Sequence, residues 1–228
     1  MRSVIVLSGG MDSATALYKV IDDAASSHAE DVHGLSFDYG QRHVKELAFA
    51  AGLCATLGIR HTVIALHIPL ASALTDPERE IPLGHYAHQT MQQTVVPNRN
   101  AIMLAIAWGV AVSEGAERVV AGMHAGDHPI YPDCRPEFVH ALEHALRLGN
   151  AGFGDAALAL FTPFIAMTKA DIVREGSGYT RPVPYDRTWS CYLGRDLHCG
   201  RCGTCVERRE AFALAGVPDP TEYEPGDR

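Results

Sequence analysis

The first residues with an evident chemical use form a glycine-rich hexapeptide near the N-terminus. It comprises Ser8, Gly9, Gly10, Met11, Asp12 and Ser13, and it follows the apolar run 3–7, which is typical of a strand buried on both faces. If a helix begins in this loop, its first backbone amides lack acceptors and can bind phosphate, and the glycines let the backbone approach closely. A plain glycine turn with a capping Asp or Ser would look similar. The chain has no G-x-x-x-x-G-K-[ST] string, so it is not a Walker-type NTPase.

Four of the six cysteines are clustered near the C-terminus, at Cys191, Cys199, Cys202 and Cys205. Disulfides are rare in the cytosol, so this cluster indicates a metal site. Four thiolates around one ion form a closed tetrahedral site, typical of structural zinc, although C-x2-C-x2-C with a distant fourth cysteine also occurs in iron–sulfur proteins. The spacing favours zinc with an architectural role. The neighbouring His198 is expected to flank the site rather than to ligate the metal.

Four further polar strings follow at intervals: residues 38–43 (DYGQRH), 96–100 (VPNRN), 131–138 (YPDCRPEF) and 188–192 (TWSCY). Each has an ordinary structural explanation when taken alone. Tyr-Pro-Asp is turn chemistry, Arg99 could be a surface charge at a helix start, and His43 could be a solvated helix residue. Their joint presence and order carry more information than any one of them.

The elements that must position these residues alternate along the chain. Apolar, β-branched runs predict strands at residues 3–7, 32–37, 61–68, 118–122 and 158–161, and apolar spacing predicts helices at 12–20, 42–57, 99–113, 136–148 and 169–174. The helix at 99–113 is apolar on nearly all sides and is expected to be buried. Alternating strands and helices predict a doubly wound parallel α/β sheet, with ligands beyond the carboxyl ends of the strands. Residues 1–184 would form this domain, and 185–228 a metal-binding tail packed on it.

Composition narrows the class of protein. The chain has 228 residues, 47% of them hydrophobic and 20% charged, which is ordinary for a globular protein. The net charge of −8 disfavours a polynucleotide partner, because non-specific nucleic-acid binding needs a basic surface. The apolar run at the N-terminus is too short for a signal peptide or a membrane span. We therefore expect a cytoplasmic protein with no membrane and no nucleic-acid partner.

With the four strings following the SGGMDS loop in this order, the chain resembles the 7-cyano-7-deazaguanine synthase family of the queuosine pathway. The resemblance covers about residues 4–210. It implies a PP-loop (adenine nucleotide alpha hydrolase-like) fold, ATP and Mg²⁺ as cofactors, Zn²⁺ in the cysteine site, and a homodimer. The implied substrates are 7-carboxy-7-deazaguanine and ammonia. ATP would adenylate the carboxylate, ammonia would convert the acyl-adenylate to an amide, and a second ATP would convert the amide to the nitrile.

The resemblance also assigns roles to residues. The six loop residues would bind ATP, and the catalytic group would be Asp12, Ser13, Arg99 and Lys169, with Asp12 holding Mg²⁺ and Lys169 stabilising phosphate charge. Asp133 would accept from the base edge, and Arg99 or Arg135 would hold the substrate carboxylate. The complete expected substrate site consists of Tyr39, Gln41, Arg42, His43, Arg99, Asn100, Asp127, Tyr131, Asp133 and Arg135.

Two strings depart from the family pattern. Many members read T-D-x-S-G before Y-P-D-C-R where this chain has residues 126–130 (GDHPI), and V-P-G-R-N becomes VPNRN through Asn98. The first departure leaves the acceptor open, since a related enzyme could transfer the activated carboxylate to another amine, for example on a protein. A tRNA-modifying PP-loop enzyme is disfavoured by the acidic, compact chain. A nucleotide-binding sensor without turnover is disfavoured by the intact SGGMDS and Lys169.

Overall fold

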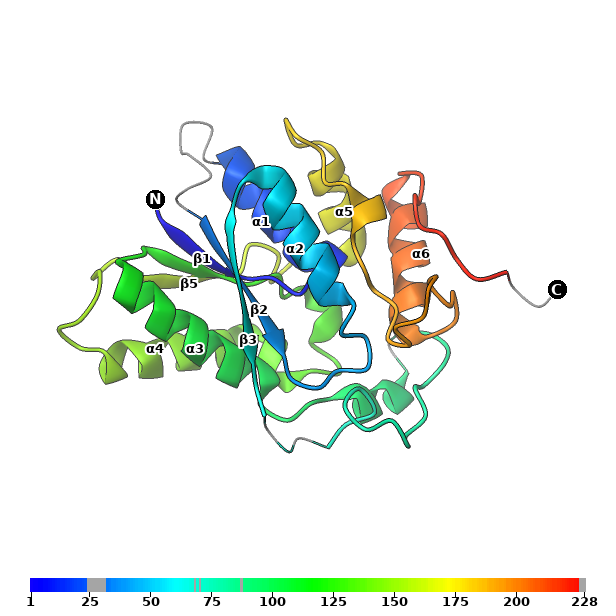
Figure 1. Ribbon diagram of the computed structural model, residues 1–228, viewed down its shortest axis with the longest axis horizontal. Helices are drawn as coiled ribbons and strands as arrows, with labels where there is room; N and C mark the ends of the chain where they lie inside the picture. Colours follow the sequence, from blue (N-terminus) through cyan, green and yellow to red (C-terminus); the bar gives the residue numbers. More distant parts are fainter. Residues whose placement is uncertain (24–31, 68, 70, 87, 226–228) are drawn as a thin grey trace.

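Five parallel strands form one sheet with helices on both faces in the computed structural model, which describes residues 1–23, 32–67, 69, 71–86 and 88–225 (Figure 1). The strand order is β3-β2-β1-β4-β5. The strands are β1 (Ser3–Val6), β2 (Val32–Asp38), β3 (Arg60–Ala65), β4 (Arg118–Val120) and β5 (Ala159–Phe161). The helices are α1 (Met11–Asp23), α2 (Glu46–Leu57), α3 (Arg99–Glu114), α4 (Pro136–Gly149), α5 (Lys169–Ser177) and α6 (Gly203–Ala215). The predicted doubly wound α/β sheet is confirmed; residue 68, the predicted end of the third strand, lies outside the described residues.

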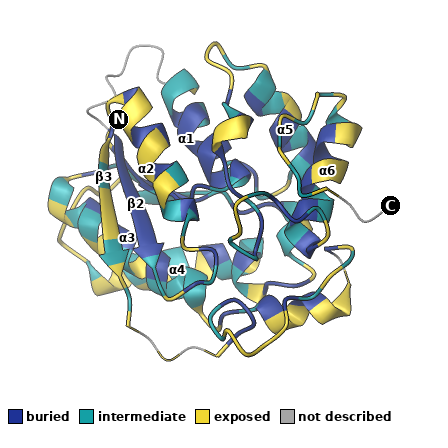
Figure 2. Ribbon diagram, turned by 45° about the vertical axis from the view of Figure 1, so that its right-hand side comes forward, coloured by how far each residue is buried: buried dark blue, intermediate teal, exposed yellow. Residues whose placement is uncertain are grey.

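The apolar core lies in two layers on either side of the sheet. Successive residues of β1 point to opposite faces, so Ile5 packs with α1, α2 and α5, while Val4 packs with α3 and α4. β2 is buried along almost its whole length, whereas the edge strand β3 is largely exposed (Figure 2). None of the helices in the described part of the chain is long and apolar enough to cross a membrane.

The strand order places a topological switch point between β1 and β4. The chain winds from β1 through β2 to β3 on one side of β1, and β4 pairs with the other side of β1. The loops after β1 and β4 therefore diverge at the same edge of the sheet, where α/β proteins bind ligands. The Gly-rich loop follows β1. Gly122 follows β4, and a Cβ at Gly122 would lie 2.8 Å from the carbonyl carbon of Asp12, so the two loops are in close contact.

Three sequence predictions about the helices were wrong or incomplete. The helix predicted at 42–57 begins at Glu46, because residues 42–45 form turns and the Arg42 amide donates to Leu74 O at 2.8 Å. α3 is not buried all round: one side of it exposes the small residues Ala105, Gly109 and Ser113. The C-terminal tail contains a full helix, α6, which was not predicted and which packs on α5.

One fully buried side chain attaches α6 to the preceding loop. The guanidinium of Arg208 donates to Tyr185 O (2.7 Å), to Thr188 Oγ1 (2.9 Å) and to Ser190 Oγ (3.0 Å). In the same loop the Trp189 amide donates to Gly9 O at 2.9 Å. The cysteine-containing segment is therefore fixed directly against the glycine-rich loop.

The departure at Asn98 has a backbone explanation. Asn98 has φ 54° and is the only non-glycine residue with positive φ in the described part of the chain. Glycine adopts this left-handed conformation without strain, and asparagine is one of the few other residues that tolerate it. An asparagine at position 98 is therefore compatible with the turn before α3.

Candidate active site

The glycine-rich loop is closed by its own side chains. Ser13 Oγ donates to Gly10 O (3.1 Å) and accepts from the Ser8 amide (3.2 Å), and the Gly10 amide donates to Ser8 Oγ (3.2 Å). Gly9 has φ 85°, and a Cβ there would lie 2.2 Å from Glu46 O, so only glycine fits. Because α1 begins at Met11, the amides of its first turn lack intrahelical acceptors. The loop is therefore built to bind an anion at a helix N-terminus.

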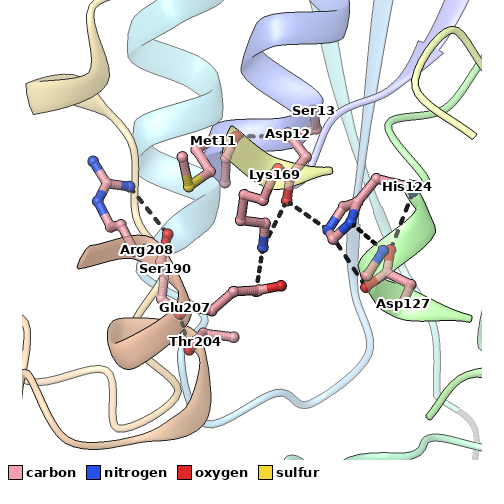
Figure 3. Close-up of polar contacts among 12 residues, drawn as sticks. Met11, Asp12, Ser13, His124, Asp127, Lys169, Ser190, Thr204, Glu207 and Arg208 are labelled. Atoms are coloured by element: carbon pink, nitrogen blue, oxygen red, sulfur yellow. Dashed lines mark hydrogen bonds and ion pairs between the residues drawn. The ribbon is translucent and has the colours of Figure 1, made fainter. Parts of the chain in front are cut away.

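Lys169 lies between two carboxylates from opposite ends of the chain (Figure 3). Its Nζ is 3.2 Å from Asp12 Oδ2 and 2.5 Å from Glu207 Oε2. Burial by itself would lower the pKa of Lys169, but Asp12 and Glu207 outweigh it and raise that pKa above its ordinary value. Lys169 is thus a fixed ammonium group beside the anion-binding loop.

His124 continues this network on the side of β4. Its Nδ1 accepts from the Gly126 amide at 3.1 Å, so in the neutral ring the proton lies on Nε2. Nε2 is 3.7 Å from Asp12 Oδ2 and 3.6 Å from Asp127 Oδ1 (Figure 3). Asp127 Oδ1 also accepts from Tyr86 Oη at 3.0 Å. The loop after β4 therefore orients Asp12 and Asp127 toward the same space.

A second set of polar residues comes from α2, α3 and the turn that precedes α2. Arg99 donates to Tyr39 Oη at 3.2 Å and has no carboxylate partner within salt-bridge distance among the described residues. Glu46 Oε1 accepts from Gln41 Nε2 at 3.1 Å. Burial raises the pKa of Glu46 to about 8, against the opposing effects of Gln41 and Arg99, and burial together with Arg99 lowers the pKa of His43 to about 3. Among the described residues, this wall therefore has one cation without a carboxylate partner, Arg99, beside Glu46 and His43, whose pKa shifts favour their neutral forms.

One cavity brings together most of the residues expected from the sequence. It is lined by Ser8, Gly10, Met11, Asp12, Ser13, Tyr39, His43, Arg99, Asn100, Asp127, Tyr131 and Lys169. The remaining five expected residues, Gly9, Gln41, Arg42, Asp133 and Arg135, do not line it.

All five have structural contacts, and Gly9 O accepts from the Trp189 amide at 2.9 Å. Within its own loop, Gln41 Nε2 donates to Phe37 O (3.0 Å) and Gln41 Oε1 accepts from the Tyr39 amide (2.9 Å). Arg42 Nη1 donates to Arg79 O (2.6 Å). Asp133 Oδ2 accepts from the Asn100 amide at the start of α3 (3.1 Å), and Arg135 Nε donates to His128 O (2.9 Å). The carboxylates that line the cavity are instead Asp12, Glu46 and Asp127.

Sequence reasoning missed several residues of the site. The cavity is also lined by Glu46, Tyr86, Trp189, Ser190, Tyr192 and Thr204. His124 and Glu207 do not line the cavity, but they lie within ion-pair distance of Asp12 and Lys169, respectively, which do. Trp189, Ser190 and Tyr192 belong to the 188–192 string, which the sequence analysis noted without assigning these residues to the site. For Glu46, three residues after His43, and Glu207, two residues after Cys205, the only signal was proximity to a motif.

The four clustered cysteines meet in space with the geometry of a single-ion site. Their Sγ atoms all lie within 4.8 Å of one another, and the Cys199–Cys205 and Cys191–Cys202 pairs are 3.9 and 4.0 Å apart. A tetrahedron with Zn–S bonds of about 2.3 Å has edges of about 3.8 Å. Backbone amides of Cys199, Arg201 and Cys202 point at the sulfurs, as expected around metal-bound thiolates. His198 is not among these four; its Nε2 accepts from the Ser190 amide at 3.1 Å.

The neutral state of Glu46 predicts a pH-dependent stability. Its folded pKa of about 8 is above the reference value of 4.5, so its contribution to stability is fully present below pH 4.5 and is lost as pH rises to about 8. Glu46→Gln cannot ionise and should therefore gain stability relative to the wild type over this range. Urea unfolding at a series of pH values measures the difference. A difference that does not change with pH, like that expected for the exposed Glu80→Gln, would show that Glu46 is not buried in this way.

Comparison with known proteins identifies the family of this chain. Residues 2–216 match the family described as "Queuosine biosynthesis protein QueC". The 7-cyano-7-deazaguanine synthases of Rhizobium meliloti (strain 1021) and Brucella ovis are each 51% identical to this chain, over 100% of it and 94% and 95% of their own lengths. Among solved structures, NMN synthetase from Francisella tularensis is 16% identical over 95% of this chain and 78% of its own, with a TM-score of 0.49, and we draw no conclusion from it. This chain belongs to the QueC family of queuosine biosynthesis proteins.

Proposed function

We propose that this protein is an ATP-dependent 7-cyano-7-deazaguanine synthase, which converts 7-carboxy-7-deazaguanine and ammonia to the nitrile. The observation that carries the proposal is the single cavity in which the anion-binding loop, Lys169 and the unpaired Arg99 meet. The loop and Lys169 suit the pyrophosphate of ATP, and Arg99 suits the carboxylate of the acid. The 51% identity to synthases over nearly their full length supports the same assignment.

The first step is activation of the carboxylate. A carboxylate oxygen attacks the α-phosphorus of ATP, the bond to the β-phosphate oxygen breaks, and pyrophosphate leaves with the bonding electrons. The α1 amides and Lys169 stabilise the charge that develops on pyrophosphate. Asp12 would hold Mg²⁺, which neutralises phosphate charge when bound. Asp12 Oδ1 suits this role because it is buried and has no partner among the described residues.

Two further steps give the nitrile. Ammonia attacks the acyl carbon, AMP leaves, and the amide forms with loss of a proton. The amide oxygen is then adenylated by a second ATP, and departure of AMP with loss of the remaining N–H protons gives the carbon–nitrogen triple bond. The same loop and Lys169 serve both activations, because each one expels pyrophosphate.

Arg99 is the better placed of the two arginines considered for the substrate carboxylate. It lines the cavity, it lies beside Tyr39, and it has no carboxylate partner within the described part of the chain, whereas Arg135 donates to His128 O outside the cavity. Asp133, considered for the base edge, lies outside the cavity as a cap for α3. Tyr39, His43, Asn100, Asp127 and Tyr131 remain in the proposed substrate site.

The metal is proposed to be Zn²⁺. The four sulfurs lie at the separations of one tetrahedral ion, whereas a four-iron cluster binds each cysteine to a different iron and holds the sulfurs further apart. We also propose that residues 185–228 form the metal-binding tail of the 1–184 domain, and that the enzyme is a cytoplasmic homodimer that does not bind nucleic acid.

Mass spectrometry of the products tests the proposed reaction. With ATP, ammonia and 7-carboxy-7-deazaguanine, the protein should form the amide and then the nitrile, with AMP released at each stage. Asp12→Ala should abolish AMP release, whereas the exposed Asp196→Ala should not. Accumulation of the adenylate or amide under saturating ATP and ammonia would favour another acceptor amine. No stimulation of AMP release by the acid would contradict the substrate assignment.

Metal analysis tests the cysteine site. The purified protein should be colourless and hold about one zinc per chain. Cys202→Ser should lose metal and melting temperature together, because metal binding contributes to folding energy. Cys54→Ala, which removes a buried thiol far from the cluster, should keep its metal. A brown protein with visible absorbance and bound iron would contradict zinc.

A further inference from the structure

The cysteine segment reaches the phosphate loop through one carboxylate. α6 starts inside the metal site, with Cys202 as its N-cap and Cys205 in its first turn. Glu207 follows half a turn later, and its Oε2 lies 2.5 Å from Lys169 Nζ at the start of α5 (Figure 3). Glu207, which contacts the ammonium group of Lys169, is thus only two residues after Cys205 of the cysteine cluster.

Glu207 is one of two carboxylates that form ion pairs with Lys169. Asp12 from α1 lies 3.2 Å from Nζ, Glu207 from α6 lies 2.5 Å away, and the Tyr86 ring centroid lies 5.6 Å away. Asp12 belongs to the loop that would receive Mg²⁺ and phosphates. The charge of Asp127 also acts on Lys169, but only Asp12 and Glu207 form ion pairs with it among the described residues. When Asp12 engages phosphate or Mg²⁺, Glu207 is the carboxylate that stays in contact with Lys169.

The contacts of Glu207 separate it from the residues that anchor α6. Arg208, the next residue, makes the hydrogen bonds that fix the helix to the 185–190 loop. Glu207 makes its hydrogen bond with Lys169. A Cβ at Gly126 would lie 3.2 Å from Glu207 Oε1, so the loop after β4 closes over this carboxylate. Its side chain is therefore directed at Lys169 rather than used to pack the helix.

We propose that Glu207 is a positioning residue for Lys169, through which the cysteine segment supports pyrophosphate release. This inference rests on the proposed function. It gives the cysteine site a consequence for catalysis: Cys202 and Cys205 would hold the first turn of α6 in place when they bind an ion, and that turn carries Glu207 to the ammonium group of Lys169.

Glu207→Gln is the direct test, because it keeps the shape of the side chain and removes its charge. We expect kcat for AMP release to fall about 10–100-fold, the range typical of residues that orient a functional group, with little change in KM for the acid. The variant should keep its metal, and the assay is run below its melting temperature, which should fall because Lys169 loses one of its two buried carboxylate partners. Glu210→Gln, on the exposed side of the same helix, should behave as the wild type.

Two readouts distinguish positioning from a general structural role. In single-turnover assays Glu207→Gln should have no further effect in a Lys169→Met background, because the two residues act as one unit. An equal loss of rate in both backgrounds would overturn the proposal, as would a wild-type kcat in Glu207→Gln.

A second measurement needs no turnover. An amine-selective acylating reagent at one fixed pH, read by peptide mass spectrometry, should label Lys169 several-fold faster in Glu207→Gln than in the wild type or Glu210→Gln. Unchanged labelling would overturn the positioning role. If the wild-type protein releases no AMP with the deazaguanine acid, the proposed function fails, while the labelling still decides the role of Glu207.

Discussion

A buried ammonium group is stable in a folded protein only when carboxylates compensate it, and Lys169 obtains those carboxylates from the first helix and the last. This requirement connects parts of the chain that are otherwise far apart. Asp12 brings the glycine-rich loop and α1 to the site, and Glu207 brings α6 with the cysteine cluster. Removing either partner would leave charge uncompensated in the interior, so the loop, α5 and α6 must be in place together for the site to exist.

The parallel sheet supplies the frame for this charge cluster. Because β1 and β4 are neighbours, the loops that follow them open at the same edge, and the glycines at positions 9 and 122 allow backbone-to-backbone contact there. The result is a rigid anion site made of amides and one cation. Such a site favours charge that develops on a leaving pyrophosphate, since its dipoles are already oriented before the reaction begins.

Sequence patterns predicted what depends on local chemistry. The alternation of strands and helices and the spacing of the cysteines are patterns of residues that are close in sequence, and the parallel sheet and the gathered sulfurs confirmed both. The start of α2 was predicted wrongly, because a hydrogen bond from Arg42 to Leu74 fixes a turn that helical spacing does not reveal. Glu207 and His124 were missed for the same reason, because each contacts the loop network through a residue remote in sequence, Lys169 for Glu207 and Asp12 for His124. Whether a polar residue such as Asp133 faces the cavity or caps a helix is likewise decided by tertiary packing.

The central claim is that the loop and Lys169 support reversible adenylation of a carboxylate. Exchange of labelled pyrophosphate into ATP, measured without ammonia, tests it most directly. The account predicts exchange that requires 7-carboxy-7-deazaguanine and is absent with an aromatic acid lacking the ring N–H and exocyclic amine. Release of ADP and phosphate in place of exchange would place the cleavage between the β and γ phosphates and would contradict the account.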